Sequence, residues 1–336
     1  MTHSRASEEF AYISIMKRCC IIYNEPGEGA LADELDVLDQ ADYIGDHLSK
    51  LGIEVYRKGI SAAFMNEIAV LASEKPDFVI NLVESINNKG ELNYFIPALL
   101  NLYSIPYSGN PLEAMFITSN KTLASSSMRN AGINNPASFL PSQMNLLTPG
   151  RKYIVKPIWE DGSLGITEES VFECKPGFED RLKGLDDSHW FIEDFIDGRE
   201  FNISILAGEN GPEVMPPAEI VFVNYGDDKP RIVDFKAKWE MDSFEYINTV
   251  REFPGKSLNP ELESNLRETA IACWNLFGLK GYARVDSRTD KDNNVFVIEI
   301  NANPCISPDG GFVAATKEAG YPFIQVIQRI INDLNR

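Results

Sequence analysis

The chain has 336 residues, of which 44% are hydrophobic and 24% are charged. This length predicts two or three lobes rather than one core, and this composition excludes wholesale disorder. The formal net charge of −19 argues against nucleic acid and anionic membranes as nonspecific partners, because the protein repels phosphate groups at long range.

The first domain is expected over residues 1–118, where short buried strands alternate with amphipathic helices. We predict strands over 19–23, 53–56 and 78–82, and helices over 32–51, 64–73 and 91–102. This alternation favours a parallel sheet with right-handed crossovers, so the predicted fold class is α/β with an N-terminal parallel-sheet domain.

A central domain is expected over residues 119–198 and a C-terminal domain over residues 199–336. The central part predicts a helix over 121–131, strands over 153–156 and 190–193, and a glycine-containing loop over 157–165. The last part predicts strands over 200–206, 215–222, 282–286 and 295–301, helices over 262–277 and 322–334, and a charged segment over 224–246. Glu200, Asn202 and Ser204 alternate with apolar residues, which predicts a half-buried strand.

The cysteines and the N-terminus favour a cytoplasmic protein. The five cysteines are odd in number and scattered, which argues against a disulfide framework, and the three histidines lie apart from them, which argues against zinc. Residues 1–9 are polar and lack a signal-peptide core, and no apolar run approaches the roughly 20 residues that a membrane helix needs.

Two strands of the last domain carry charged side chains on one face. The two-residue period groups Val297 with Glu299 and Asn301 in one strand, and Arg284 with Asp286 in the other. A four-residue hairpin loop over 291–294 would set Asp286 opposite Glu299 and Arg284 opposite Asn301. Opposed carboxylates repel each other, and a hard dication relieves the repulsion. The pattern predicts a Mg²⁺ or Mn²⁺ site beside an arginine suited to phosphate, and a merely solvated face is the alternative.

Other features are typical of nucleotide binding. Lys156 ends an apolar strand and precedes a loop with Gly162 and Gly165, whose backbone can approach phosphate closely, although no Walker A sequence occurs. Glu193 closes an apolar strand, and Glu200 is suited to accept hydrogen bonds from ribose hydroxyls. An ordinary surface turn and a solvated hairpin end are the alternatives for these features.

The glycines near the N-terminus suit a dinucleotide cofactor less well. Gly27-x-Gly29-x-x-Ala32 follows a predicted strand and opens a helix, but Arg57 and Lys58 stand where the ribose-binding acid is expected. A glycine-rich turn that faces a substrate is the favoured interpretation.

Eight short stretches follow one another in the order 105–110, 119–121, 155–157, 193–200, 216–220, 234–238, 281–286 and 299–304. In this order they resemble the ATP-grasp superfamily, and within it the D-alanine–D-alanine ligase-like branch. The resemblance extends from about residue 78 to the C-terminus, and it implies a three-lobed ATP-grasp architecture with α+β ATP-grasp lobes.

The resemblance also implies roles for individual residues. ATP would be bound by Lys121, Lys156, Ser163, Glu193, Phe195, Ile196, Glu200 and Lys238. Two Mg²⁺ ions (or Mn²⁺) would be held by Asp286, Glu299 and Asn301. Arg284, Lys238 and Lys156 would be catalytic, with Arg284 stabilising an acyl phosphate and a tetrahedral intermediate.

The implied reaction is the ADP-forming ligation of a carboxylate to an amine. The carboxylate attacks the γ-phosphorus of ATP, and the amine then attacks the acyl phosphate and displaces phosphate. Such chemistry needs cations and water-excluding lids rather than a nucleophilic side chain. The partners would be small-molecule carboxylates and amines, and relatives imply a possible homodimer.

The amino-acid half departs from the family pattern. Residues 24–30, with Glu28, replace a glycine-glycine-x-serine-x-glutamate segment, and Val83-Glu84-Ser85 replaces a histidine-glycine motif. Cys305 stands in place of a glycine, and the serine expected to grip the second substrate's carboxylate is replaced near Gly310. Glu28, Cys305 and Gly310 are therefore the candidate substrate residues.

These departures indicate substrates other than two D-alanines. An authentic D-alanine–D-alanine ligase, a nucleotide-binding protein without catalysis and a dinucleotide-dependent oxidoreductase are the alternatives.

Overall fold

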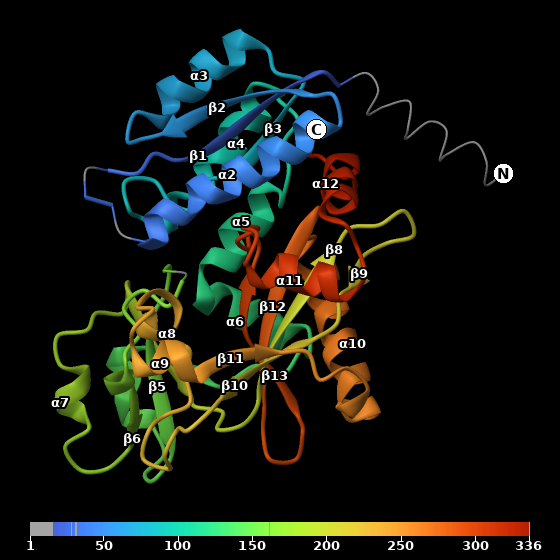
Figure 1. Ribbon diagram of the computed structural model, residues 1–336. Helices are drawn as coiled ribbons and strands as arrows, with labels where there is room; N and C mark the ends of the chain where they lie inside the picture. The colour runs from blue at the N-terminus through green and yellow to red at the C-terminus, as the bar shows by residue number, and fades with distance from the viewer. Residues whose placement is uncertain (1–15, 28, 31, 161, 336) are drawn as a thin grey trace.

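The computed structural model describes residues 16–335 apart from 28, 31 and 161. Three separate sheets lie in three parts of the molecule (Figure 1). No helix among the described residues has both the length and the apolar composition to cross a membrane. All five cysteines lie in the described part and are free.

The first sheet is parallel, as predicted, with the order β2-β1-β3. Its elements are β1 (Arg18–Asn24), α2 (Ala32–Lys50), β2 (Glu54–Ile60), α3 (Phe64–Glu74), β3 (Phe78–Leu82), η1 (Gly90–Leu92) and α4 (Phe95–Leu102). The helix predicted over 91–102 is therefore two elements. Helices cover both faces of the sheet, because Cys19 and Ile21 of β1 pack toward α2 while Cys20 and Ile22 pack toward α3 and α4.

The C-terminal helix α12 (Phe323–Asn332) completes the core of this first lobe. Its residues Val326, Ile327 and Ile331 are buried in the same cluster as Ile44 and Leu48 of α2. The two ends of the described chain therefore share one hydrophobic core.

The second sheet has four antiparallel strands in the order β4-β7-β5-β6. It contains β4 (Ser138–Phe139), β5 (Lys152–Pro157), β6 (Val171–Glu173) and β7 (Trp190–Asp194), with η2 (Pro141–Leu146), η3 (Glu168–Ser170) and α7 (Glu179–Leu182). The helices α5 (Leu112–Ser119) and α6 (Lys121–Asn130) precede it. A small core that includes Tyr153, Phe172 and Ile192 holds this sheet together.

The third sheet has six strands, with the order β11-β10-β8-β12-β13 and β9 paired to β8. It contains β8 (Glu200–Leu206), β9 (Glu213–Val214), β10 (Ala218–Phe222), β11 (Thr249–Glu252), β12 (Tyr282–Thr289) and β13 (Val295–Asn301). The other elements are α8 (Phe235–Trp239), α9 (Phe244–Asn248), η4 (Gly255–Ser257), α10 (Pro260–Phe277) and α11 (Gly311–Glu318).

Helix α10 covers one face of the third sheet. It begins with Asn259, whose side chain accepts backbone hydrogen bonds at the N-terminus, and ends at Gly278, which adopts a left-handed φ of 61°. Its predicted apolar stripe, which includes Leu266 and Ala270, is buried against β8 and β12. The opposite face of the sheet is thereby left for the polar side chains.

The prediction of a half-buried β8 is wrong. Glu200 and Ser204 on the polar face are buried, as are Phe201 and Ile203 on the apolar face. The strand is central in its sheet, so neighbouring strands cover both of its edges, and other parts of the chain bury both of its faces. Its polar residues consequently lie in a largely dehydrated environment.

Candidate active site

The predicted pairing of the two charged strands is confirmed. Asp286 lies opposite Glu299, and Arg284 lies opposite Asn301. The loop is one residue longer than predicted, because Thr289 already pairs with Val295. A β-bulge then places the extra residue Ile298 on β13, and this bulge restores the predicted register at the carboxylates.

Because of the bulge, Val297 lies on the opposite face of β13 from the one predicted. The two-residue period grouped Val297 with Glu299 and Asn301, but Val297 is buried with Ile300 in the core beneath α10. Because the bulge adds one residue to β13, the alternation of faces is interrupted between Val297 and Glu299.

The polar face continues across three strands. Asp286 of β12 lies opposite Asn202 of β8, and Arg288 lies opposite Glu200. The amide of Asn202 donates a hydrogen bond to Asp286 Oδ1 at 2.9 Å. Sequence reasoning missed Arg288, because the predicted strand ended at Asp286 whereas β12 extends to Thr289.

The two carboxylates of the strand pair contact cations. Arg284 donates to both oxygens of Asp286, with Nε–Oδ1 at 2.7 Å and Nη2–Oδ2 at 2.8 Å. Lys121 Nζ lies 2.9 Å from Glu299 Oε1. Burial alone would raise the pKa of Glu299, but the charges of Lys121 and Lys238 outweigh it and hold the pKa at about 2. Glu299 is therefore an anion in the folded protein.

Lys121 is brought to the strand pair by the start of α6. Asn120 caps this helix, since its side chain accepts a hydrogen bond from Leu123 N at 2.9 Å. Lys121 is the next residue, and it also donates to the carbonyl of Glu160 at 2.6 Å. Lys121, Glu193 and Glu299 line one small cavity, so the central and C-terminal parts of the sequence converge there.

The second sheet contributes an ion pair between Lys156 and Glu193, both of them buried. Lys156 lies on β5 and Glu193 on β7, and they occupy the same face because Glu193 lies opposite Ile154. Phe195 and Ile196 follow directly after β7, and Phe195 packs with Ile154 in a small apolar cluster.

Glu200 is the first residue of β8 in the third sheet. Burial raises its pKa, and the charge of Arg288 opposes that shift, with Arg288 Nε 3.8 Å from Glu200 Oε2. The guanidinium of Arg288 also lies 4.9 Å from the centre of the Phe195 ring. Arg288 thus joins the ribose and adenine candidates, Glu200 and Phe195.

Lys238 lies on the charged segment, which contains the helices α8 and α9. Asp234 caps α8, since its Oδ1 accepts from Ala237 N at 2.9 Å. Burial lowers the pKa of Lys238, and Arg284 lowers it further, whereas Glu299 and Asp286 raise it. Lys238 therefore lies within electrostatic reach of the strand pair.

The glycine-containing loop and α8 are in direct contact. Trp239 Nε1 donates to the carbonyl of Gly162 at 3.2 Å. Ser163 has a left-handed φ of 65°, and its hydroxyl donates to the carbonyl of Val233 at 2.6 Å. The loop and the segment that carries α8 therefore pack against each other, a contact that no local pattern predicts.

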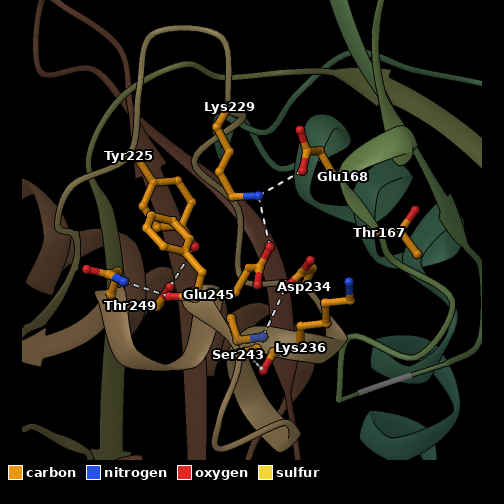
Figure 2. Close-up of polar contacts among 12 residues, drawn as sticks. Thr167, Glu168, Tyr225, Lys229, Asp234, Lys236, Ser243, Glu245 and Thr249 are labelled. Atoms are coloured by element: carbon orange, nitrogen blue, oxygen red, sulfur yellow. Dashed lines mark hydrogen bonds and ion pairs between the residues drawn. The ribbon is translucent and has the colours of Figure 1, made fainter.

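Another contact of the charged segment is with η3, which follows the glycine-containing loop (Figure 2). Lys229 Nζ bridges Glu168 Oε2 at 2.7 Å and Glu245 Oε1 at 2.8 Å. Burial lowers the pKa of Lys229, but the hydrogen bonds to both carboxylates outweigh this and raise it above its ordinary value. Nearby, Ser243 caps α9 by accepting from Tyr246 N at 3.0 Å.

The substrate candidates fall partly within the described structure. Glu28 lies outside the described residues. Cys305 Sγ donates to Asp36 Oδ2 at 3.0 Å and lies 2.9 Å from Ser307 Oγ. Burial and the adjacent Asp36 raise the pKa of the Cys305 thiol, which is therefore neutral. Gly310 is the residue before α11 and has no side chain to cap that helix.

Helix α2 of the first lobe contacts the loop that carries Cys305 and Ile306. Gln40 is buried, and its Oε1 accepts a hydrogen bond from Ile306 N at 3.0 Å. Its Nε2 donates to Asp36 Oδ2 at 3.0 Å. Asp36 and Gln40 were not among the predicted site residues, because their partners lie far away in the sequence.

Comparisons with known proteins agree with this arrangement. A family model described as D-ala D-ala ligase C-terminus matches residues 147–332. The D-alanine–D-alanine ligase of Aquifex aeolicus is 28% identical over 289 residues, which cover 84% of this chain and 90% of that protein.

Two crystal structures have the same fold. The D-alanine–D-alanine ligase of Bacillus anthracis complexed with ATP has a TM-score of 0.71 at 19% identity, covering 94% of this chain and 96% of that chain. The VanG D-Ala:D-Ser ligase of Enterococcus faecalis has a TM-score of 0.70 at 16% identity, covering 94% of this chain and 98% of that chain.

The predicted three-lobed ATP-grasp architecture is thereby confirmed, and the protein is an ATP-grasp ligase. The chain belongs to the D-alanine–D-alanine ligase family, since the family model covers more than half of its length.

Proposed function

We propose that the chain uses ATP to join a carboxylate to an amine through an acyl phosphate, releasing ADP. The observation that carries this proposal is the convergence of three lysines on one strand pair. Lys121 contacts Glu299, and the charges of Lys238 and Lys156 act on the same carboxylate. These lysines come from three separate segments, an arrangement suited to a polyphosphate rather than to one structural ion pair.

The nucleotide would lie between the second and third sheets. Its phosphates would be bound by Lys121, Lys156, Lys238 and the loop at Ser163, and its adenosine by Glu193, Phe195, Ile196 and Glu200. In the described structure Lys121 and Lys156 are neutralised by Glu299 and Glu193, so binding of phosphate exchanges these partners.

The residues fit a hard dication by the chemistry of their donors. Asp286, Glu299 and Asn301 present two carboxylates and one amide on the same face of a strand pair, and Mg²⁺ prefers such oxygens. When bound, the metal neutralises phosphate charge and polarises the phosphoryl oxygens. We propose two ions, as the family resemblance implies.

The chain's own residues would orient and shield the reactants. Arg284 is held by Asp286 on the polar face through Nε and Nη2, and its remaining N–H donors would face a developing oxyanion. Lys238 and Trp239 lie on the segment that closes over the glycine-containing loop. Closure of these segments would exclude water from the acyl phosphate.

We propose substrates other than a pair of D-alanines. This rests on the substrate end of the site, where Cys305 contacts Asp36 and where Gly310 offers no side chain to a carboxylate. The alternative, D-alanine–D-alanine ligation, is favoured by the activity named for the Aquifex aeolicus relative. A catalytically silent nucleotide-binding protein is the third candidate.

Release of ADP tests these candidates. The purified protein is incubated with ATP, Mg²⁺ and pairs drawn from D- and L-amino acids and small carboxylates, and ADP is measured by a coupled assay. ADP release that depends on both partners supports the ligase, and activity restricted to D-alanine supports the alternative. Binding of ATP without ADP release from any pair would support the third candidate, a catalytically silent nucleotide-binding protein.

The division into residues 1–118, 119–198 and 199–336 remains part of the proposal. Each of the three sheets lies within one of these ranges. Helix α12, however, packs in the core of the first lobe. Proteolysis in the presence and absence of ATP would test where the boundaries lie.

A further inference from the structure

Arg251 lies on the polar face of the third sheet, although it belongs to the edge strand β11. It lies opposite Ile220 of β10, which lies opposite Glu200 of β8. Side chains of directly opposed residues share one face of an antiparallel sheet. Arg251 therefore projects from the same face as Glu200 and Arg288, while its neighbour Val250 projects from the other.

The guanidinium of Arg251 reaches the loop that follows the strand pair. Its Nη1 donates to the carbonyl of Asp309 at 3.3 Å. A Cβ added to Gly311 would lie 3.7 Å from Nε and 3.8 Å from Nη2, so the guanidinium rests against this glycine. The side chain remains exposed, and an incoming group can reach its remaining N–H donors.

Arg251 also lies within electrostatic reach of Arg284. Partial burial lowers the pKa of Arg251, and the positive charge of Arg284 lowers it further, whereas Asp309 and Cys305 raise it. Arg284 is occupied by Asp286, while the one hydrogen bond described for Arg251 is to a neutral carbonyl. Two cations that repel each other favour an anion between them.

We propose that Arg251 is a specificity-determining residue that binds a carboxylate of the amine substrate. Gly310 and Gly311 at the start of α11 provide no side chain that could bind a carboxylate, and the guanidinium of Arg251 from β11 lies beside Gly311. The inference rests on the proposed ligase function and adds to it a residue outside the nucleotide and metal sites. Amines without a carboxylate are then poor substrates.

Matched acids and amides test this role. The amine substrates are D-alanine, D-serine and L-alanine and the corresponding amides, in which the carboxylate is replaced by a neutral group. ADP release is measured at saturating ATP for the wild type, Arg251→Gln and Arg251→Lys. We expect the wild type to show a KM about 10- to 100-fold lower for an acid than for its amide, the size of one charge-assisted contact.

Arg251→Gln is expected to remove this difference by raising the KM for the acid, while kcat and the KM for ATP stay within about threefold. Arg251→Lys should recover part of it, because the charge returns without the planar fork. Arg267→Gln is the control, since it removes one guanidinium from α10, where Arg267 pairs with Glu263.

An unchanged preference for acids in Arg251→Gln, or equal use of acids and amides by the wild type, would overturn the role of Arg251. If the wild type releases no ADP with any pair, the proposed function fails by itself. Calorimetric binding of the same acids and amides, with a non-hydrolysable ATP analogue present, then decides the subsite. Preferential binding of acids that is lost in Arg251→Gln supports it, and no preference refutes it.

Discussion

Replacement of Glu299 by glutamine tests the centre of the proposed site. The change keeps the size and one acceptor oxygen of the side chain but removes the charge that pairs with Lys121 at 2.9 Å. A carboxylate of this kind supplies several kcal/mol of charge stabilisation in the transition state. Because each 1.4 kcal/mol corresponds to about a tenfold rate, turnover should fall by about 10³-fold or more.

The same change has a calculable effect on stability. The side chains of Lys121 and Glu299 are 8% and 22% exposed, so the lysine loses its partner in a poorly hydrated position. Removing one member of a fully buried pair costs about 3–5 kcal/mol. Glutamine still accepts a hydrogen bond, which reduces the expected loss to about 1–3 kcal/mol.

The assay compares ADP release and thermal unfolding for the wild type, Glu299→Gln and a control, Glu263→Gln. Glu263 pairs with Arg267 on the surface of α10, where loss of an exposed pair costs less than about 1 kcal/mol. Near-normal turnover of a folded Glu299→Gln protein would refute the assignment of Glu299 to the metal and phosphate site.

Three further outcomes follow from the described contacts. Lys156→Met should weaken ATP binding and lower the free energy of unfolding by about 3–5 kcal/mol, because Glu193 loses its buried partner. Lys156→Met combined with Glu193→Gln should lower it by less than the sum of the single changes, and a double-mutant cycle by urea unfolding measures this difference. Lys229→Met should raise the KM for ATP about 3- to 10-fold with little loss of stability, because the bridge between Glu168 and Glu245 is lost. Lys175, which pairs with Glu173, is the control, and an equal rise in KM for Lys175→Met would contradict the prediction. Gly198→Ala should destabilise the protein by about 3 kcal/mol, since the added Cβ would lie 1.8 Å from the carbonyl oxygen of Thr289. A calorimetric unfolding midpoint equal to that of the wild type would exclude this clash.

Long periodic segments were predictable from the sequence because burial repeats along them. The stripe of α10 and the strands β3, β8 and β13 were predicted with accurate positions. Elements of two to four residues, such as β4, β6, β9 and β11, escaped prediction. They are too short for a period, and pairing with a neighbouring strand defines them.

The position of the site was predictable for a different reason. The charged pairs of β12 and β13 are close in sequence, so a hairpin alone brings Asp286 and Glu299 together. The loop length was predicted one residue too short and the bulge at Ile298 was not predicted, but these two errors cancel, so the predicted pairing of Asp286 with Glu299 is right. The roles of individual residues in binding remain predictions.

Contacts between distant segments carry no local pattern. Trp239 meets Gly162, and Cys305 meets Asp36, across 77 and 269 positions of sequence. A sequence shows the residues at such contacts but not their partners. The contacts of Cys305, a candidate substrate residue, belong to this class, so they could not be predicted from the sequence.

The packing of α12 on α2 has a consequence for biosynthesis. The core of the first lobe includes Val326, Ile327 and Ile331, which are synthesised after the other elements of that core. Asn335 also exchanges two backbone hydrogen bonds with Tyr107, at 3.1 and 2.9 Å. The strands and helices of the first lobe must therefore wait with an exposed apolar face until α12 has been synthesised. A nascent chain released before α12 would be a substrate for chaperones rather than a smaller enzyme.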